Sequence, residues 1–385
     1  MDSSDVANTA AGRGRDTLTA VVDEVAALTR ELNPERPALQ LGPDSSLERD
    51  AGLDSLARVE LLRRIEQRLG VSLDEQRVLA AEAIGDLLDA LQEPGTQATA
   101  SPRAATGSGP ALQPPARAQT LMEALCWYAE AAPERIHIRF YADAADAETY
   151  LSYGELWHQA RAAAAALRQR GVGAGASVAL MLPTGSEFFA VFCAALLAGA
   201  VPVPIYPPVR RAQLGDYLQR QARILDNAAT AVLVTAAEAK PVARFLLTRV
   251  ASMRSVATPD ELLAQPPGEI VAARSDDLAL LQYTSGSTGN PKGVELTHAN
   301  LLANIRAMGG ALEVGADDVF VSWLPLYHDM GLIGAWLGSL YYGMPLVLMS
   351  PLAFIARPER WLRAIHRHSG TLSAAPNFAY DLCVD

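Results

Sequence analysis

The chain has 385 residues, half of them hydrophobic, so it is long enough for two or more domains with sizeable cores. Its 32 basic and 43 acidic residues give a net charge of −11, which argues against nucleic-acid binding as its main activity. Cys126, Cys193 and Cys383 lie far apart without metal or disulfide spacing, which indicates a reducing compartment.

The N-terminal residues 1–16 lack the apolar core of a signal peptide and are expected to be disordered. Two apolar stretches, Phe188–Ile205 and Gly331–Ala356, are candidates for membrane spans, but prolines and glycines interrupt them. Each is better explained as a buried helix followed by a buried strand. We therefore predict no integral membrane segment and a cytoplasmic protein.

Residues 17–92 show helical patterns and predict a small, all-α four-helix bundle. The first predicted helix, Thr17–Leu32, places its apolar residues on one face. The second half of Leu47–Gly70 is an amphipathic helix, and Ala83–Leu91 is the last helix of the unit.

Ser55 follows Asp54 where a loop enters the second of these helices. Taken alone, this pair is ordinary helix-capping chemistry. The wider run Gly52-Leu53-Asp54-Ser55-Leu56 resembles the prosthetic-group site of acyl carrier proteins. That resemblance implies that a phosphopantetheinyl transferase attaches 4′-phosphopantetheine to Ser55, and that the thiol of this group carries acyl chains.

Residues 93–118 are rich in Pro, Ala, Gly, Ser and Thr, which predicts a flexible linker. Such a linker either tethers the carrier near a neighbouring site or only separates two domains. From residue 119 onward, helix and strand patterns alternate, which predicts a largely parallel sheet covered on both faces. The expected fold class is therefore multidomain, with the helical unit followed by an α/β domain over residues 119–385.

The α/β domain is predicted in some detail. The expected helices are Leu121–Ala132, Tyr153–Arg170, Glu187–Ala198, Tyr217–Asn227 and His298–Met308. The expected strands are His137–Tyr141, Ser177–Leu182, Val201–Tyr206, Ala231–Thr235, Leu278–Tyr283 and Val319–Leu324.

The strand Leu278–Tyr283 leads into a run of small and hydroxylated residues that is typical of a phosphate-binding loop. The predicted phosphate-binding residues are Thr284, Ser285, Gly286, Ser287, Thr288, Gly289 and Lys292. Hydroxyls donate to phosphate oxygens, glycines let the backbone approach a ligand, and Lys292 adds a positive charge. A P-loop is excluded, because Lys292 follows Pro291 and no Ser or Thr follows the lysine. The alternative is a flexible surface loop.

The loop resembles the phosphate-binding signature of the adenylate-forming superfamily, which includes acyl-CoA synthetases and peptide-synthetase adenylation domains. The resemblance implies that the loop closes over the β- and γ-phosphates of ATP, with Mg²⁺ as a further cofactor. It also implies that Lys292 is a catalytic residue that helps to hold the pyrophosphate leaving group.

The runs WLPLYHDMGLIG and APNFAY resemble fatty acyl-AMP ligases in particular. In that family the position of His328 lines the acyl and carboxylate pocket. A catalytic pair of His328 with Asp329 is not expected, because neighbouring residues of a strand face opposite sides.

The implied function is activation of a fatty acid as acyl-AMP, followed by transfer to a phosphopantetheine thiol, with acyltransferase or synthase modules downstream. Two alternatives remain: the loading portion of a polyketide or peptide synthase, and a non-catalytic carrier and docking protein. The chain stops at Asp385, before the family's later motifs, including the glutamate that contacts magnesium. The adenylation domain is therefore expected to be incomplete, and no metal ligand is assigned.

Overall fold

A computed structural model describes most of the chain. It covers residues 17–30, 41–47, 50–51, 61, 64–65, 68–69, 81, 83–92, 112–141, 148–208, 214–284, 292–315 and 317–384. The predicted attachment residue Ser55 lies outside the described residues, as does the predicted linker up to residue 111. The chain divides into two compact units, one built on Met1–Pro102 and the other on most of the remaining residues, and each is described separately.

The described residues of the N-terminal unit include two continuous helices, and an isolated antiparallel bridge joins Ser46 to Ala83. A helix spans residues 17–30, and α4 spans Ile84–Gln92. The prediction of one buried face on the first helix is confirmed, because Val21, Val25 and Leu28 are buried in the unit's core. The other buried core residues are Leu47, Ala51, Leu61, Ile65, Ala81, Ile84 and Leu87.

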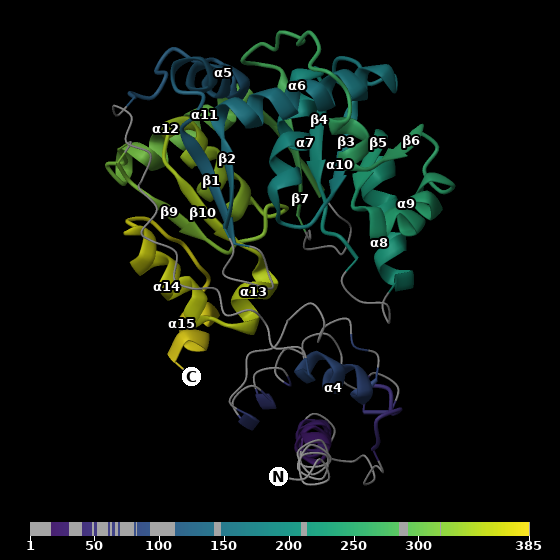
Figure 1. Cartoon of the computed structure of the whole chain (residues 1–385). Helices are drawn as coiled ribbons and strands as arrows, with labels where there is room; N and C mark the ends of the chain where they lie inside the picture. Colours follow the sequence, from purple (N-terminus) through teal and green to yellow (C-terminus); the bar gives the residue numbers. More distant parts are fainter. Residues whose placement is uncertain are drawn as a thin grey trace, which may run out of the picture. The chain divides into compact units, whose positions relative to one another are not determined.

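The second unit is an α/β domain in which helices and strands alternate (Figure 1). Its strands are β1 Ile136–Tyr141, β2 Glu148–Ser152, β3 Ser177–Met181, β4 Val201–Pro204, β5 Thr230–Thr235, β6 Ser255–Ala257, β7 Leu278–Thr284, β8 Lys292–Thr297, β9 Phe320–Ser322 and β10 Leu346–Met349. Its longer helices are α5 Leu121–Ala131, α6 Tyr153–Gln169, α7 Ser186–Leu197, α8 Leu214–Asn227, α9 Lys240–Leu247, α11 His298–Ala311, α14 Glu359–His368 and α15 Asn377–Val384. Shorter helices are η2 Ala237–Ala239, α10 Pro259–Leu263, the π-helix η3 Met330–Leu337, α12 Gly338–Tyr342 and α13 Pro351–Ala356.

The strands form two sheets and a hairpin. One sheet has the order β4-β3-β5-β6 and is parallel throughout. The second has the order β2-β1-β10-β9, in which only β2 is antiparallel to its neighbour. Strands β7 and β8 pair with each other in antiparallel fashion, and β7 lies against β4. The expectation of a largely parallel sheet is therefore confirmed, although the strands divide between two sheets.

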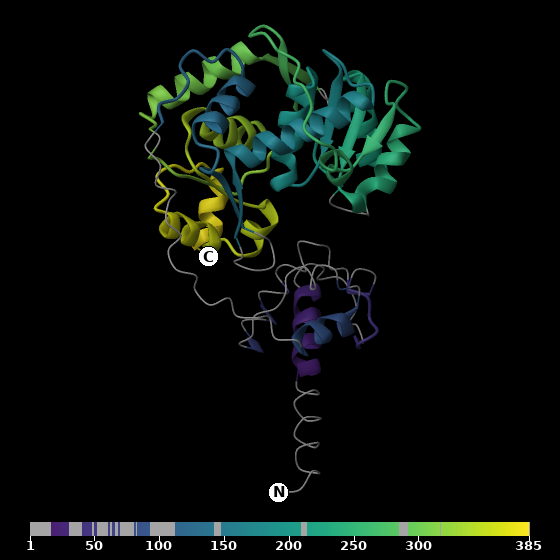
Figure 2. The same ribbon diagram turned by 45° about the horizontal axis from the view of Figure 1, so that its top comes forward.

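Helices cover both faces of the β4-β3-β5-β6 sheet, because β3, β4 and β5 are buried at every position, on both faces. Helices α8 and α9 pack on the face that carries Ala179 and Leu233 (Figure 1). The opposite face, with Val178 and Leu180, belongs to a larger core that also takes in α6 and α7. Figure 2 shows the same two layers of helices from a direction turned by 45°.

The apolar stretch Phe188–Ile205 is an interior element. Helix α7 is buried along most of its length, and Phe188, Phe189 and Phe192 surround the indole ring of Trp336 from η3. A helix that is apolar on every side is typical of a protein core as well as of a membrane. Within the described ranges, no helix is long and apolar enough to span a membrane.

Candidate functional site

The predicted phosphate loop connects the two strands of the β7–β8 hairpin. Thr284 and Lys292 pair directly across the hairpin at its loop end, and both are exposed. The predicted residues Ser285, Gly286, Ser287, Thr288 and Gly289 lie outside the described residues. The element after the loop is a strand, which differs from the strand–loop–helix order of a P-loop and supports its exclusion.

Close packing of Tyr283 and Gly293 holds the base of this hairpin together. The two residues face each other in register, and a Cβ atom at position 293 would lie 3.0 Å from Cζ of Tyr283. The hydroxyl of Tyr283 donates a hydrogen bond to Oδ1 of Asn227 on α8. A side chain at position 293 would press on the tyrosine ring, which would have to shift by a few tenths of an ångström. Lys292 therefore follows directly on a closely packed pair.

His328 lies in a turn after β9, and this strand is shorter than the predicted Val319–Leu324. Strand β9 ends at Ser322, and the chain then turns into η3, with the Leu332 N–H donating to the His328 carbonyl at 2.8 Å. Nδ1 of His328 lies 2.6 Å from Oδ1 of Asp329, so the argument that these side chains face opposite sides was wrong. Both side chains are more than 60% exposed, and exposed pairs of this kind contribute little to stability.

Gly331 makes this turn possible. A Cβ atom there would lie 2.9 Å from the Leu324 carbonyl oxygen and closer still to that of Pro325. No side chain fits against two backbone oxygens at such distances. The turn that carries His328 is therefore formed by backbone packed on backbone.

Two buried polar side chains attach the turn to the neighbouring strands. Oγ1 of Thr184, just after β3, accepts a hydrogen bond from the Leu326 N–H at 3.3 Å. Nε2 of Gln282 on β7 donates to the Tyr327 carbonyl at 3.0 Å. Gln282 thus joins the strand that leads into the phosphate loop to the residue before His328. Sequence reasoning missed both residues, although a single amide in the otherwise apolar strand was a usable signal.

Among the described residues, no hydrogen-bond donor reaches the side-chain oxygen of Gln282. Because the Tyr327 carbonyl can only accept, the amide nitrogen of Gln282 must face it, and Oε1 is the atom left over. Gln282 is 6% exposed and Oε1 is buried without a partner. Burying such an acceptor costs roughly 1–3 kcal/mol, so this oxygen lowers the stability of the fold.

A cluster of tyrosine side chains borders the turn on the side of β4. The ring of Tyr206 lies 6.2 Å from that of Tyr327 and 5.3 Å from that of Tyr217. The Tyr217 hydroxyl donates to the Tyr206 carbonyl, and the guanidinium of Arg220 lies 6.0 Å from the Tyr206 ring. Burial raises the pKa of Tyr327, so its hydroxyl stays protonated at neutral pH.

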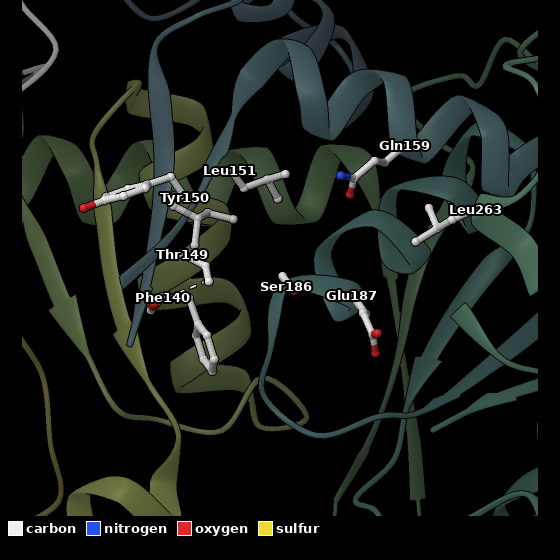
Figure 3. A pocket seen from close by; sticks show the side chains of 9 residues that line it. Phe140, Thr149, Tyr150, Leu151, Gln159, Ser186, Glu187 and Leu263 are labelled. Atoms are coloured by element: carbon white, nitrogen blue, oxygen red, sulfur yellow. Dashed lines mark hydrogen bonds between the residues drawn. The ribbon is translucent and has the colours of Figure 1, made fainter. Parts of the chain in front are cut away.

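A cavity of about 250 Å³ lies between the β1–β2 hairpin and helices α6, α7 and α10 (Figure 3). Its lining residues are Ile138, Phe140, Thr149, Tyr150, Leu151, Gln159, Ser186, Glu187 and Leu263. In Figure 3 the side chains of Ser186 and Glu187, from the start of α7, lie across the cavity from Phe140 and Thr149. Helix α7 follows β3 and Thr184, so this rim of the cavity lies near the His328 turn.

No magnesium ligand can be assigned among the residues that the structure describes. Within the described part of the structure, no three His, Cys, Asp or Glu side chains come together in a way that would hold a metal ion. The polar groups identified at this edge are instead suited to phosphate and carboxylate oxygens, with a lysine, a histidine and hydroxyls as donors.

Two sheets, the hairpin between them and the site at their carboxyl edges define the α/β fold of adenylate-forming enzymes. The chain belongs to the family of AMP-binding enzymes, whose profile matches residues 125–385. A second profile, that of the phosphopantetheine attachment site, matches residues 20–91. The protein therefore combines a carrier domain with an adenylate-forming domain.

Several characterised proteins are similar to this chain. Long-chain-fatty-acid–AMP ligase FadD32 of Mycolicibacterium smegmatis is 38% identical over 246 residues, which cover 60% of this chain and 37% of that protein. Medium-chain-fatty-acid–[acyl-carrier-protein] ligase JamA of Moorena producens is 38% identical over 243 residues, or 61% of this chain and 40% of JamA. The fatty acyl-adenylate ligase of L. pneumophila, solved with acyl adenylate and pyrophosphate, superposes with a TM-score of 0.61 at 33% identity. That superposition covers 70% of this chain and 46% of the solved one, so the chain spans less than half of these relatives.

Proposed function

We propose that the protein activates a fatty acid as acyl-AMP with ATP and then transfers the acyl group to the phosphopantetheine thiol of a carrier domain. One observation carries the proposal. Thr284 and Lys292 flank the loop of the hairpin, and Gln282 of the same hairpin forms a hydrogen bond with the turn that carries His328. A phosphate-binding loop and a carboxylate site are thereby held on adjoining parts of one framework. The similar proteins that act on fatty acids support this choice of substrate.

The domain boundaries follow the chain's composition. Residues 17–92 form a four-helix carrier domain with Ser55 as the attachment residue, and residues 93–118 form the linker. Residues 119–385 form the part of the adenylation domain that this chain contains. Residues 1–16 form a disordered N-terminal segment before the carrier domain. A phosphopantetheinyl transferase is the required partner, synthase or acyltransferase modules are the expected users of the acyl group, and the cytoplasm is the expected location.

The first step is attack of the fatty carboxylate on the α-phosphorus of ATP, which releases pyrophosphate. Lys292 and the loop that begins at Thr284 offset the charge on the departing β- and γ-phosphates, while His328 lines the carboxylate site. Magnesium, when bound, supplies further neutralisation of the phosphates. The acyl group then passes to a thiol, supplied by the carrier's prosthetic group on Ser55, and AMP leaves.

Fatty-acid-dependent exchange between ATP and labelled pyrophosphate tests the first step. Lys292→Ala should lower exchange by roughly 10²–10³, the usual cost of removing one group that stabilises developing charge. Lys240→Ala is the matched control, because that lysine forms an ion pair with Glu261 away from the hairpin. Equal exchange rates in the two variants would contradict the role of Lys292.

A further inference from the structure

The last residues of the predicted linker are attached to the α/β unit. Residues 112–118 are described, whereas residues 93–111 lie outside the described part of the chain. Leu112 packs against the large hydrophobic core of the unit, and Ala118 is buried in that core. The Ala118 N–H donates to the Pro115 carbonyl at 2.9 Å, which closes a turn between these two contacts. Contact with the domain thus begins at residue 112, within the range that composition assigns to the linker.

Arg306 of α11 holds this segment against the domain. Its Nη2 donates to the carbonyl oxygen of Ala118 at 2.7 Å and to that of Ala116 at 3.3 Å. Its Nε donates to the Tyr341 hydroxyl on α12 at 2.8 Å, and the guanidinium lies 5.2 Å from the centre of the Tyr341 ring. Because a guanidinium donates through a rigid planar fork, the bond to Tyr341 fixes the direction of the bonds to the two carbonyls. One half-buried side chain thus joins the segment to α11 and α12.

Helix α11 also holds the chain where α5 begins. His298, eight positions before Arg306, accepts a hydrogen bond from the Leu121 N–H. Eight residues of helix span about 12 Å, so the two contacts lie at separate points along α11. Helix α12 lies beside both α5 and α11 (Figure 1). The chain between Ala116 and Leu121 is therefore attached to the same helix twice.

We propose that Arg306 is a positioning residue for acyl transfer, an inference that rests on the proposed function. By holding residues 116–118, Arg306 sets the point at which the tether of the carrier begins. The tether then comprises residues 93–111, which reach roughly 65 Å at full extension, whereas release of residues 112–118 extends the reach to roughly 90 Å. Effective concentration falls roughly as the −3/2 power of tether length, so release lowers it about 1.6-fold. Arg306 thereby favours loading of the carrier in its own chain.

Limited proteolysis with trypsin tests the attachment without depending on the proposed function. Arg117 is exposed, but cleavage after it requires the backbone on both sides to open. Arg306→Met should speed this cleavage about tenfold or more, because hydrogen bonds from a charged donor are lost and more of the segment is open. Arg249→Met is the matched control and should not change it. That guanidinium also lies over an aromatic ring, 4.5 Å from the centre of Phe245, but on α9.

A mixture of two chains tests the positioning role. The active chain carries phosphopantetheine and is mixed with an equally modified Lys292→Ala chain, which serves as a second carrier, before MgATP and a fatty acid are added. Intact mass separates the two chains, so the acyl increments give the ratio of loading within a chain to loading between chains. Adenylation and the thiol reaction are common to both routes, and the ratio therefore depends on the tether. Arg306→Met in the active chain should lower this ratio about 1.6-fold, and Arg249→Met should leave it unchanged.

Tyr341→Phe is a second variant that keeps the ring beside the guanidinium. It removes only the acceptor of the Arg306 Nε, so cleavage after Arg117 should increase less than in Arg306→Met. The hydrogen bond from the Tyr128 hydroxyl to the Tyr341 carbonyl is retained. If circular dichroism shows that Arg306→Met does not fold, Tyr341→Phe takes its place in both comparisons.

The possible failures are distinguishable. Equal cleavage after Arg117 in the wild-type chain and Arg306→Met would overturn the attachment. A loading ratio in Arg306→Met that equals or exceeds that of the wild-type chain would overturn the positioning role, as would an equal fall in Arg249→Met. If the wild-type chain loads neither carrier, the proposed function fails and the positioning role fails with it, whereas the trypsin result still decides the attachment.

Discussion

The two ends of β7 differ in the exposure of their polar residues, and the candidate site lies at the exposed end. At the carboxyl end, Thr284 and Lys292 are exposed, and Gln282 connects the strand to the exposed His328. At the amino end, His298 begins α11 and is 1% exposed. Its Nδ1 accepts a hydrogen bond from the Leu121 N–H, so this histidine fixes the start of α5.

The difference shows that histidine and polar groups alone do not identify a site. Burial lowers the pKa of His298 to about 4, so it is a neutral acceptor within the framework at neutral pH. The carboxyl end of β7 instead lies beside the exposed side chains of Lys292 and His328, which are accessible to a ligand. The predictions below change residues at or near the two ends of β7 and compare their effects on stability and activity.

The largest effect is expected from Gly331→Ala at the carboxyl end. The new Cβ atom would press on the carbonyl oxygens of Leu324 and Pro325. We therefore expect the free energy of unfolding to fall by about 3 kcal/mol. Gly334→Ala in the same helix is the control, because its Cβ would have nothing within 4 Å. The free energy of unfolding of Gly334→Ala should rise by about 0.5–1 kcal/mol, because alanine has a better helix propensity than glycine. Urea titration measures both, and equal midpoints would contradict the described turn.

At the amino end, His298 should make stability depend on pH. Its pKa is about 4 in the folded chain and near 6.5 when unfolded, so the unfolded state binds the proton more readily. Its contribution is complete above about pH 6.5 and is lost as the pH falls toward 4, amounting to about 2 kcal/mol between pH 7.5 and 5. His298→Gln should reduce the slope of the stability curve over that interval, and the exposed His366→Gln should not. Part of the slope should remain in His298→Gln, because burial lowers the pKa of His137 to about 3. An unchanged slope in His298→Gln would refute this assignment.

Gln282→Met should separate activity from stability. The variant breaks the hydrogen bond to Tyr327 but also removes the unpaired Oε1, so the two effects on unfolding nearly cancel, to within about 1 kcal/mol. Adenylation should fall about tenfold, as expected when a turn near the reacting groups loses its alignment.

Gln221→Met is the control for this variant. Gln221 is fully buried on α8, and neither its nitrogen nor its oxygen has a hydrogen-bond partner in the part of the chain that the structure describes. The substitution should stabilise the chain by about 1 kcal/mol without changing pyrophosphate exchange. If both glutamine variants lose activity equally, the alignment argument for Gln282 fails.

The smallest effect is expected from Tyr283→Phe at the base of the hairpin. The ring remains over Gly293, and only the hydrogen bond to Asn227 is lost. Because Asn227 is exposed, water replaces the hydroxyl, and the loss should be about 0.5–1 kcal/mol by urea titration. A loss as large as that of Gly331→Ala would mean that the hairpin depends on more than this packing.

The sequence predicted those parts of the site that local patterns encode. Local patterns predicted the apolar strand β7 and the helix after Thr297, and they also indicated the hydroxyl-rich run that follows β7. Thr297 and Asn300 form a capping box at the start of α11. Strand β8 was missed, because its sequence KGVELT has no apolar run and is a strand only through pairing with β7.

The geometry around His328 could not be read from the sequence, because it depends on residues far apart in the chain. The predicted strand continued through Trp323 and Leu324, whereas β9 ends at Ser322. What fixes the turn is Thr184, 142 positions before Leu326, and Gln282, 45 positions before Tyr327. Neither contact has a local signature, so only the structure reveals that the loop and the turn are joined.

Intact mass spectrometry of the whole chain tests the central claim most directly. The protein is first treated with a phosphopantetheinyl transferase and coenzyme A, and then with MgATP and a fatty acid. We expect a phosphopantetheine increment that disappears in Ser55→Ala, followed by an acyl increment that disappears in Lys292→Ala and persists in Lys240→Ala. An undiminished acyl increment in Lys292→Ala, or a phosphopantetheine increment retained in Ser55→Ala, would contradict the account.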